Sequence, residues 1–213
     1  MILVVIGSVW SFRNGTFSIF DSEDISQGFD TFVSLEGGDE YVIAKFSTKE
    51  ELTRTQYNPI FGLPVGDTQV TLSLVANYKY YVKLGELTQN LEGDTLFINA
   101  PELYLSTPVA FEFSSVREKG EVSAFGPDPQ KMLNKLKRDA STELAFKGRL
   151  HTSIAYDKAA KALAENFNNY FKANGMQSYY KSIAVSFSSE KEQTIRRFLF
   201  SKGRAWSKAL GNK

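Results

Sequence analysis

The stretch Gly126-Pro-Asp-Pro129 divides the chain into two parts with different hydrophobic periods. Before it, apolar and polar side chains alternate, as in Thr68-Gln-Val-Thr-Leu-Ser-Leu74, and strict alternation indicates a β-strand with one buried face. After it, apolar side chains recur every third or fourth residue, which is the spacing of an amphipathic helix. The chain therefore predicts strands followed by helices, which is the arrangement of an α+β fold.

The strands expected before residue 126 have polar threonine and lysine side chains on one face, which indicates an antiparallel sheet with one solvated side. We expect them at residues 41–46, 68–74 and 76–83 and around Leu96 and Ile98 up to Pro101. Residues 102–113 predict a further strand pair or one bent strand. Residues 57–66 contain two prolines and two glycines and predict a loop. The preceding residues 16–25 are compatible with a strand or an exposed linker, and the glycines within residues 21–40 predict turns.

The region after residue 126 predicts a helical hairpin. Pro129 suits the first turn of a helix that continues to about Lys147, and Gly148 offers a stop. A second helix begins at Thr152 or Ser153 and ends at Asn174-Gly175, a usual left-handed ending. Residues 182–187 then return to the strand period. The predicted fold is an antiparallel sheet covered by a C-terminal helical hairpin, with a return strand after it.

The chain ends define two further segments around a domain expected at residues 13–188. Residues 1–12 are mostly apolar, and they predict the remnant of a membrane anchor, a buried first strand or a signal peptide. Trp10 and Phe12 followed by Arg13 are typical of a membrane interface. Residues 189–213 form a basic amphipathic segment, for which the pattern predicts a last helix over 189–210.

Bulk composition excludes several classes of function. The 213 residues include no cysteine, which excludes disulfides and thiolate metal sites. The formal net charge of +1 gives no general attraction to nucleic acid. Outside residues 1–12, no apolar run is long enough for a membrane-spanning helix.

Catalytic residues are not indicated by the sequence. His151 is the single histidine, so a histidine-rich zinc site is excluded, and the pattern predicts a surface residue or a residue at the N-terminus of a helix. No Gly-x-Ser-x-Gly elbow or phosphate-binding loop is present. A pair such as Glu86 and Glu92 is the basis of one alternative, a hydrolase that uses two carboxylates. We predict no catalytic, cofactor-binding or metal-binding residue, and no cofactor.

The basic segment of residues 189–213 is the charged feature of the sequence that indicates a binding surface. A basic amphipathic helix with a tryptophan binds an anionic membrane surface or a partner, whereas the alternative is a terminal helix whose apolar face docks on the domain. The residues expected to make the membrane or partner contact are Ile195, Arg196, Arg197, Phe198, Lys202, Arg204, Trp206 and Lys208. The tyrosines near Lys79 predict a cross-strand aromatic ladder, with a base-stacking platform as the alternative.

Three segments together resemble the bacterial domain of unknown function family 4230. They are residues 63–87 (LPVGDTQVTLSLVANYKYYVKLGEL), 93–103 (GDTLFINAPEL) and 155–175 (AYDKAAKALAENFNNYFKANG). The resemblance covers residues 41–187 and contains no catalytic signature. Residues 81–85 depart from the family pattern, which has a glycine and an aspartate before the leucine. The resemblance implies one N-terminal transmembrane helix and a domain outside the cytoplasm.

These observations lead to one expected function and two alternatives. We expect a non-catalytic, membrane-associated binding or scaffold domain on the extracytoplasmic side of a bacterial membrane. Its expected partner is an anionic membrane surface or an envelope protein, and nucleic acid is not an expected partner. The alternatives are the hydrolase with paired carboxylates and a soluble cytoplasmic interaction module, in which residues 1–12 pair as an ordinary strand.

Overall fold

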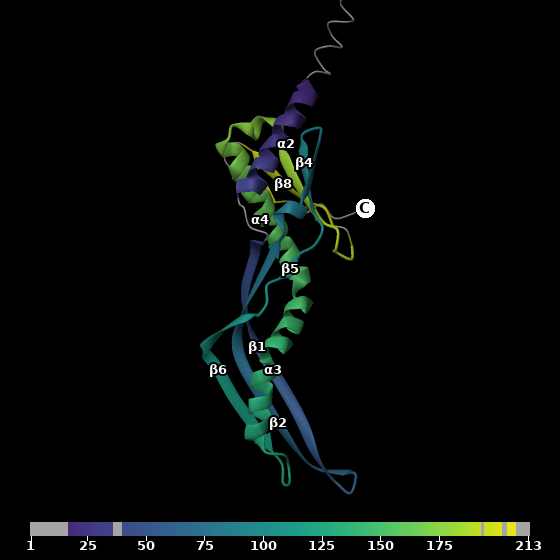
Figure 1. The fold of residues 1–213 in the computed structure, drawn as a ribbon, viewed down its shortest axis with the longest axis vertical. Coiled ribbons are helices and arrows are strands. Elements are labelled where there is room, and N and C mark those ends of the chain that lie inside the picture. Colours follow the sequence, from purple (N-terminus) through teal and green to yellow (C-terminus); the bar gives the residue numbers. More distant parts are fainter. Residues whose placement is uncertain (1–16, 36–39, 193, 202–203, 208–213) are drawn as a thin grey trace, which may run out of the picture. The chain divides into compact units, whose positions relative to one another are not determined.

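The computed structural model describes residues 17–35, 40–192, 194–201 and 204–207, and the chain has an α+β fold (Figure 1). The chain divides into two compact units. Unit 1 comprises Met1–Ala44, Tyr81–Tyr104 and Ser153–Lys213, and unit 2 comprises Lys45–Tyr80 and Leu105–Thr152. The units are described separately below.

Unit 2 is built on a long β-hairpin. Its strands β1 (Tyr41–Ile60) and β2 (Leu63–Val82) are neighbours in a sheet, and both begin or end in unit 1. Strand β6 (Ala110–Val122) pairs antiparallel with β2, from Thr68 opposite Val122 to Asn77 opposite Ala110. The short strand β5 (Tyr104–Leu105) is the other neighbour of β2. The prolines and glycines of residues 57–66 do not form the expected loop, because both strands continue to a turn at Phe61-Gly62.

Helix α3 (Pro129–Leu150) covers one face of this sheet. It begins where the sequence predicts, because the Asp128 carboxylate accepts hydrogen bonds from the backbone N–H groups of Gln130 and Lys131. The buried side chains of the helix recur at helical spacing, and those of β2 alternate, so both predicted periods are confirmed. They are Met132, Leu133, Leu136, Ala140 and Leu144 on α3, and Val70, Leu72, Leu74, Ala76, Tyr78 and Tyr80 on β2.

Unit 1 contains a mixed sheet with the order β3-β4-β7-β8-β9. The strands are β3 (Thr88–Glu92), β4 (Thr95–Ala100), β7 (Ser182–Phe187), β8 (Arg196–Ser201) and β9 (Arg204–Ser207). The return strand β7 is confirmed, and it lies in the middle of the sheet, parallel to β4 and antiparallel to β8. Both β4 and β7 are buried along nearly their whole length. Each strand has one fully apolar face, and the other face carries hydrogen-bonded polar side chains, with Thr95 paired to Ser182 and Asn99 to Ser186.

Two helices pack in unit 1. Helix α4 (Thr152–Ala173) follows α3 directly, as the sequence predicts, and Gly175 after it has a left-handed φ of 76°. Helix α2 (Phe17–Leu35) packs its aromatic side chains on α4, with the rings of Phe29 and Phe167 stacked at 5.0 Å. Short 3-10 turns occupy Leu84–Glu86 (η1) and Met176–Tyr179 (η2).

The expectation of a strand or linker over residues 16–25 and of turns after it is wrong where the structure describes the chain. Ile25, Phe29 and Phe32 lie on one buried helical face, so the period of these residues is helical. Gly28 permits close packing, because a Cβ atom there would lie 2.6 Å from the sulfur of Met176. The glycine marks a helix contact and not a turn.

The predicted last helix over residues 189–210 is also wrong. Residues 196–201 and 204–207 are strands β8 and β9, and β8 extends the sheet by pairing with β7. Arg196 and Phe198 are buried, whereas Ile195 and Leu199 are exposed. Burial therefore partly alternates along this segment, as in a strand, but the basic residues concealed the alternation in the sequence. Residues 1–12, the predicted anchor remnant or first strand, lie outside the described residues. Among the described helices, none is long and apolar enough to cross a membrane.

Candidate functional site

The base of the β1–β2 hairpin in unit 2 holds a buried polar cluster around Glu50, whose side chain is 7% exposed. Its carboxylate lies 2.9 Å from Lys147 Nζ and 2.9 Å from His151 Nε2, and it accepts a hydrogen bond of 3.1 Å from the Tyr78 hydroxyl. Burial raises the pKa of Glu50, but the hydrogen bonds from Lys147, His151 and Tyr78 and the Lys147 charge together outweigh burial and lower that pKa. Glu50 is therefore a charged anchor between the sheet and the end of α3.

His151 is the residue of this cluster that sequence reasoning missed. It was expected on the surface or at the N-terminus of a helix, whereas it caps the C-terminus of α3. Its ring also packs edge-on against Phe46 and Tyr78. The partner Glu50 precedes it by 101 positions, so only the alternation of β1, which turns Glu50 to the covered face, could have indicated the contact.

The contacts of this cluster converge on the Glu50 carboxylate. Lys147, His151 and Tyr78 all contact this one carboxylate. Burial, together with the Glu50 charge, raises the pKa of the Tyr78 hydroxyl far above its usual value. The neighbouring Tyr80 hydroxyl donates to the carbonyl oxygen of Gly148, and burial raises its pKa to about 12. Both tyrosines stay protonated, so the cluster stabilises the fold of this unit.

The opposite end of the hairpin exposes large apolar side chains. We call this group the apolar tip. It consists of Tyr57, Phe61, Leu63, Val65 and Phe125, with exposed fractions of 59%, 102%, 69%, 42% and 72%. Residues 55–66 contain no Asp, Glu, Lys or Arg. Large apolar side chains exposed together in one region are typical of a contact with a protein or a membrane.

The backbone of the apolar tip is unusual for its residue types. Phe61 and Gly62 have φ values of 52° and 81°, the signs that a two-residue type I′ hairpin turn requires at both central positions. Phe125 also has a positive φ, 66°. Bulky side chains disfavour this conformation, which suits glycine or asparagine. The two phenylalanines therefore adopt a backbone conformation that their residue type disfavours.

Hydrogen bonds fix the loop that carries Phe125 against the hairpin. Asp67 and Ser123 exchange hydrogen bonds of 2.6–2.9 Å, and Thr68 donates to the carbonyl oxygen of Pro127. Asn58 donates to the carbonyl oxygen of Phe125 itself at 3.1 Å. Gly126 allows this approach, because a Cβ atom there would lie 2.4 Å from the backbone oxygen of Asp67. The apolar side chains are thus presented on an ordered backbone.

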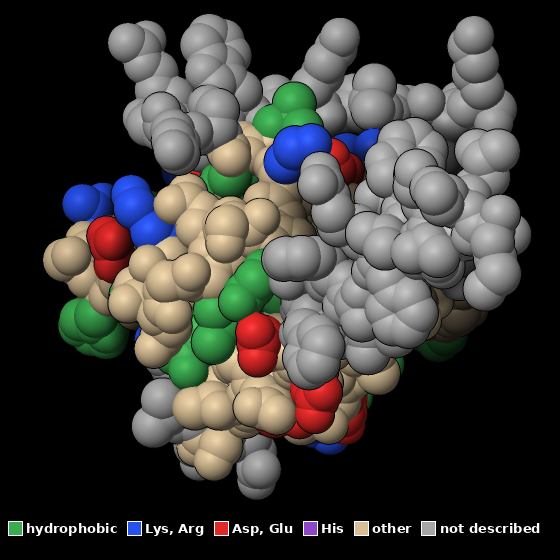
Figure 2. Space-filling view, turned by 90° about the horizontal axis from the view of Figure 1, so that it is seen from above, with side chains coloured by type: hydrophobic (Ala, Val, Ile, Leu, Met, Phe, Trp, Pro, Cys, Tyr) green, Lys and Arg blue, Asp and Glu red, His purple; other side chains and the backbone are tan. Residues whose placement is uncertain are grey.

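Among the contact residues predicted in the basic segment, the four with described side chains do not share one exposed face. Arg196 is buried and paired with Glu190 at 2.7 Å and with Asp157 at 2.5 Å, and Phe198 is buried, so neither is a surface contact. Ile195 is 46% exposed, and Arg197 is half-buried. The structure describes the backbone of Arg204 and Trp206 in β9 but not their side chains, and Lys202 and Lys208 lie outside the described residues. Figure 2 shows described lysine and arginine side chains in small groups near acidic ones.

The other sequence candidates are separated or buried. Glu86 bonds to Lys83 and Tyr104, whereas Glu92 accepts from Asn90, so each carboxylate has its own partners. A base-stacking platform of tyrosines is excluded for Tyr78 and Tyr80, which are 1% and 0% exposed. The rings of Phe46, Tyr78 and Tyr80 instead form the expected cross-strand contacts. Within the described ranges, no group of three or more acidic or histidine side chains could hold a metal ion.

The chain was compared with protein-family models, curated proteins and solved structures, and none of them matches it.

Proposed function

We propose that this chain is a non-catalytic, membrane-associated binding or scaffold domain whose unit 2 contacts a bilayer through the apolar tip. The observation that carries the proposal is the full exposure of Phe61 together with the exposed Leu63, in residues 55–66, which have no charge, with Phe125 exposed on the neighbouring loop. Full transfer of a leucine or phenylalanine side chain out of water contributes about 1.5–3 kcal/mol. Partial insertion of these three side chains is therefore enough for reversible binding.

The composition of the tip favours a bilayer over a protein surface. Charged side chains at an interface select and orient a protein partner, and residues 55–66 have none. A charge inserted into hydrocarbon is costly, so its absence suits lipid. Pro59 and Pro64 flank the turn and have no backbone N–H, which removes two donors that would lose water on insertion. Tyrosine and phenylalanine are suited to the membrane interface.

The placement outside the cytoplasm and the relationship to family 4230 remain part of this proposal. They are supported by the three segments that resemble the family and by the apolar character of residues 1–12. The contact residues now proposed differ from those expected from the sequence, because Arg196 and Phe198 of the basic segment are buried.

Vesicle co-sedimentation tests the proposal. We expect the protein to bind vesicles of pure phosphatidylcholine about as well as vesicles that also contain phosphatidylglycerol, because the tip is uncharged. The double variant Phe61→Asp/Leu63→Asp is expected to lose at least about tenfold in binding. Phe113→Asp is the matched control, since Phe113 is 86% exposed on β6 of the same unit but is not part of the tip.

Three outcomes would contradict the proposal. The first is that the wild type does not sediment with either vesicle. The second is that the tip variant binds like the wild type, and the third is that the Phe113→Asp control loses as much binding as the tip variant. Binding that requires phosphatidylglycerol and survives in the tip variant would instead favour the basic segment of residues 189–213.

A further inference from the structure

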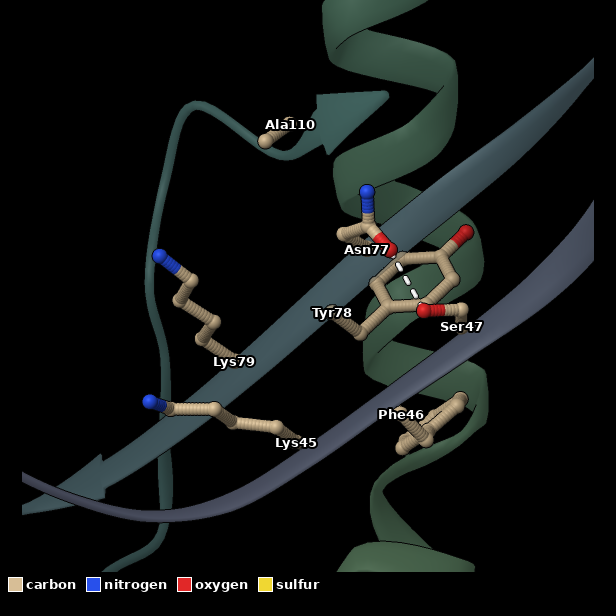
Figure 3. Close-up of a pocket in the computed structure, with 7 residues that line it drawn as sticks. All are labelled: Lys45, Phe46, Ser47, Asn77, Tyr78, Lys79 and Ala110. Carbon is tan, nitrogen blue, oxygen red and sulfur yellow. Dashed lines mark hydrogen bonds between the residues drawn. The ribbon is translucent and has the colours of Figure 1, made fainter. Parts of the chain in front are cut away.

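The solvent-facing side of the hairpin base carries a pocket of about 360 Å³. It is lined by Lys45, Phe46, Ser47, Asn77, Tyr78, Lys79 and Ala110, all within unit 2 (Figure 3). Figure 3 shows the side chains of Lys45 and Lys79 pointing the same way, toward the segment that leads into β6. The pocket is therefore a concave surface with two cationic groups on one side.

The two lysines oppose each other across the hairpin. The Ser47 hydroxyl contacts the Asn77 amide oxygen at 2.5 Å, and the hydroxyls of Thr53 and Thr71 lie 3.2 Å apart. These contacts define one register between β1 and β2, which places Lys45 opposite Lys79. Like charges directly opposite each other destabilise an antiparallel pair.

No carboxylate of the pocket compensates these charges. None of the lining residues is acidic, and neither lysine forms an ion pair with a described residue of the chain. Glu112 follows Ala110 by two residues on β6 and does not line the pocket. Elsewhere on the same hairpin, Lys49 pairs with Glu51 at 3.7 Å, so the strands do supply partners to other lysines.

Further hydrogen-bonding groups accompany the two ammonium groups. The Ser47 hydroxyl directs its proton to the Asn77 oxygen, which leaves the Asn77 Nδ2 group pointing away from Ser47 (Figure 3). The two ammonium groups, which point the same way, are donors without a competing carboxylate, and such a pair matches the oxygens of a phosphate group. We infer that this pocket binds a phosphate group, which relieves the repulsion between Lys45 and Lys79.

A dissolved phosphate ester fits the position of the pocket better than a lipid headgroup. A β-strand rises about 3.3 Å per residue, so the part of β1 from Lys45 to the turn spans up to about 50 Å. A bilayer that accepts the apolar tip end-on therefore has its headgroups far from this pocket. The phosphate site itself involves other residues than the membrane proposal and stands without it, whereas its assignment to a dissolved ligand rests on the proposed insertion of the apolar tip.

Calorimetric titration of the full chain with inorganic phosphate tests the inference. We expect saturable binding that weakens about tenfold in Lys45→Gln and in Lys79→Gln, because each variant loses a charged hydrogen bond. Lys49→Gln is the matched control and is expected to stay within about twofold of the wild type, since Lys49 lies on the same strand outside the pocket. Absence of saturable binding, or equal weakening by all three variants, would overturn the site.

A charge reversal keeps the test decisive if a lysine variant folds poorly. Lys45→Glu is expected to pair with Lys79, to raise the melting temperature without phosphate, and to abolish the further rise that phosphate gives the wild type. A phosphate-dependent rise in Lys45→Glu equal to that of the wild type would contradict the inference.

Vesicle sedimentation of Lys45→Gln/Lys79→Gln identifies the source of the phosphate group. Unchanged sedimentation together with lost phosphate binding is the expected result, and it assigns a dissolved ligand. Lost sedimentation without any binding of free phosphate by the wild type would overturn that assignment and indicate a lipid headgroup.

Discussion

The base and the tip of the β1–β2 hairpin are made from the same two strands but have opposite surfaces. At the base, a charged glutamate is buried and fully bonded, and the tyrosines beside it are less than 2% exposed. At the tip, phenylalanine and leucine side chains are 69–102% exposed, and no charge occurs over residues 55–66. The polar group is inside and the apolar groups are outside, so each end reverses the usual distribution.

The difference separates stability from binding within one element. A buried carboxylate persists only because lysine, histidine and tyrosine side chains replace its water, so the base depends on each partner. Exposed apolar side chains contribute little to folding, so the tip is free to serve a contact. Changes at the base should therefore alter unfolding, and changes at the tip should alter association.

The largest expected effect is at the base. Glu50→Ala leaves the Tyr78 hydroxyl buried without an acceptor and removes the partner of Lys147 and His151. We expect a loss of about 2–3 kcal/mol in the free energy of unfolding, reduced from that of a fully buried pair because Lys147 and His151 are about one-third exposed. Urea denaturation measures the loss. Glu51→Ala is the control and is expected to change stability by less than about 0.5 kcal/mol; equal losses would contradict the role of Glu50.

Overpacking next to the same cluster should have a slightly smaller effect. A Cβ atom at Gly148 would lie 2.7 Å from Leu105 Cδ2 and 2.9 Å from two ring atoms of Tyr78, all in unit 2. We expect Gly148→Leu to lower the free energy of unfolding by about 2 kcal/mol, since the Tyr78 ring and the Leu105 side chain must move. Thermal unfolding would show it, and a melting temperature equal to that of the wild type would mean that α3 does not pack this closely on β2.

The pH dependence of stability provides a third test of the base. The pKa of Glu50 in the folded protein is lower than its usual value of 4.5, so the carboxylate binds fewer protons when folded than when unfolded. Its stabilisation is therefore present above pH 4.5 and is lost as the pH falls through the lowered pKa. Unfolding free energies measured from pH 7 downward should fall less steeply below pH 4.5 in Glu50→Gln than in the wild type. Parallel curves would exclude Glu50 as a source of acid sensitivity.

The smallest expected change in stability occurs at the tip and has the opposite sign. Asn-Gly is the favoured pair for a type I′ turn, so Phe61→Asn should raise the free energy of unfolding by about 0.5–1 kcal/mol. The same variant should bind vesicles less well than the wild type, because it loses the most exposed apolar side chain. Urea denaturation and sedimentation measure the two effects. A variant that is less stable, or that binds equally well, would break the contrast between tip and base.

Local patterns in the sequence predicted the parts of the fold that depend on local physics. Strict alternation located β2 and β7, and Asp128-Pro129 located the start of α3. Patterns with mixed signals failed: the acidic residues and Gly28 concealed the buried stripe of α2, and the arginines and lysines after residue 195 concealed strand β8.

The candidate sites required contacts between distant residues. Glu50 and His151 are far apart in sequence, and the opposition of Lys45 and Lys79 depends on a strand register that the sequence does not specify. Residues 57–66 looked like an ordinary loop, because prolines and glycines usually indicate one. Only the extended strands and the turn at Phe61-Gly62 reveal that the loop is an exposed apolar tip.

The most direct test of the central claim is the emission of a tryptophan placed at the tip. The two native tryptophans, Trp10 and Trp206, are first replaced by phenylalanine, and Phe61→Trp is compared with Thr53→Trp on the same strand. With phosphatidylcholine vesicles, we predict that emission from position 61 shifts to the blue and is quenched by brominated lipid, while emission from position 53 does not change. Unchanged emission at both positions would contradict insertion of the apolar tip into a bilayer.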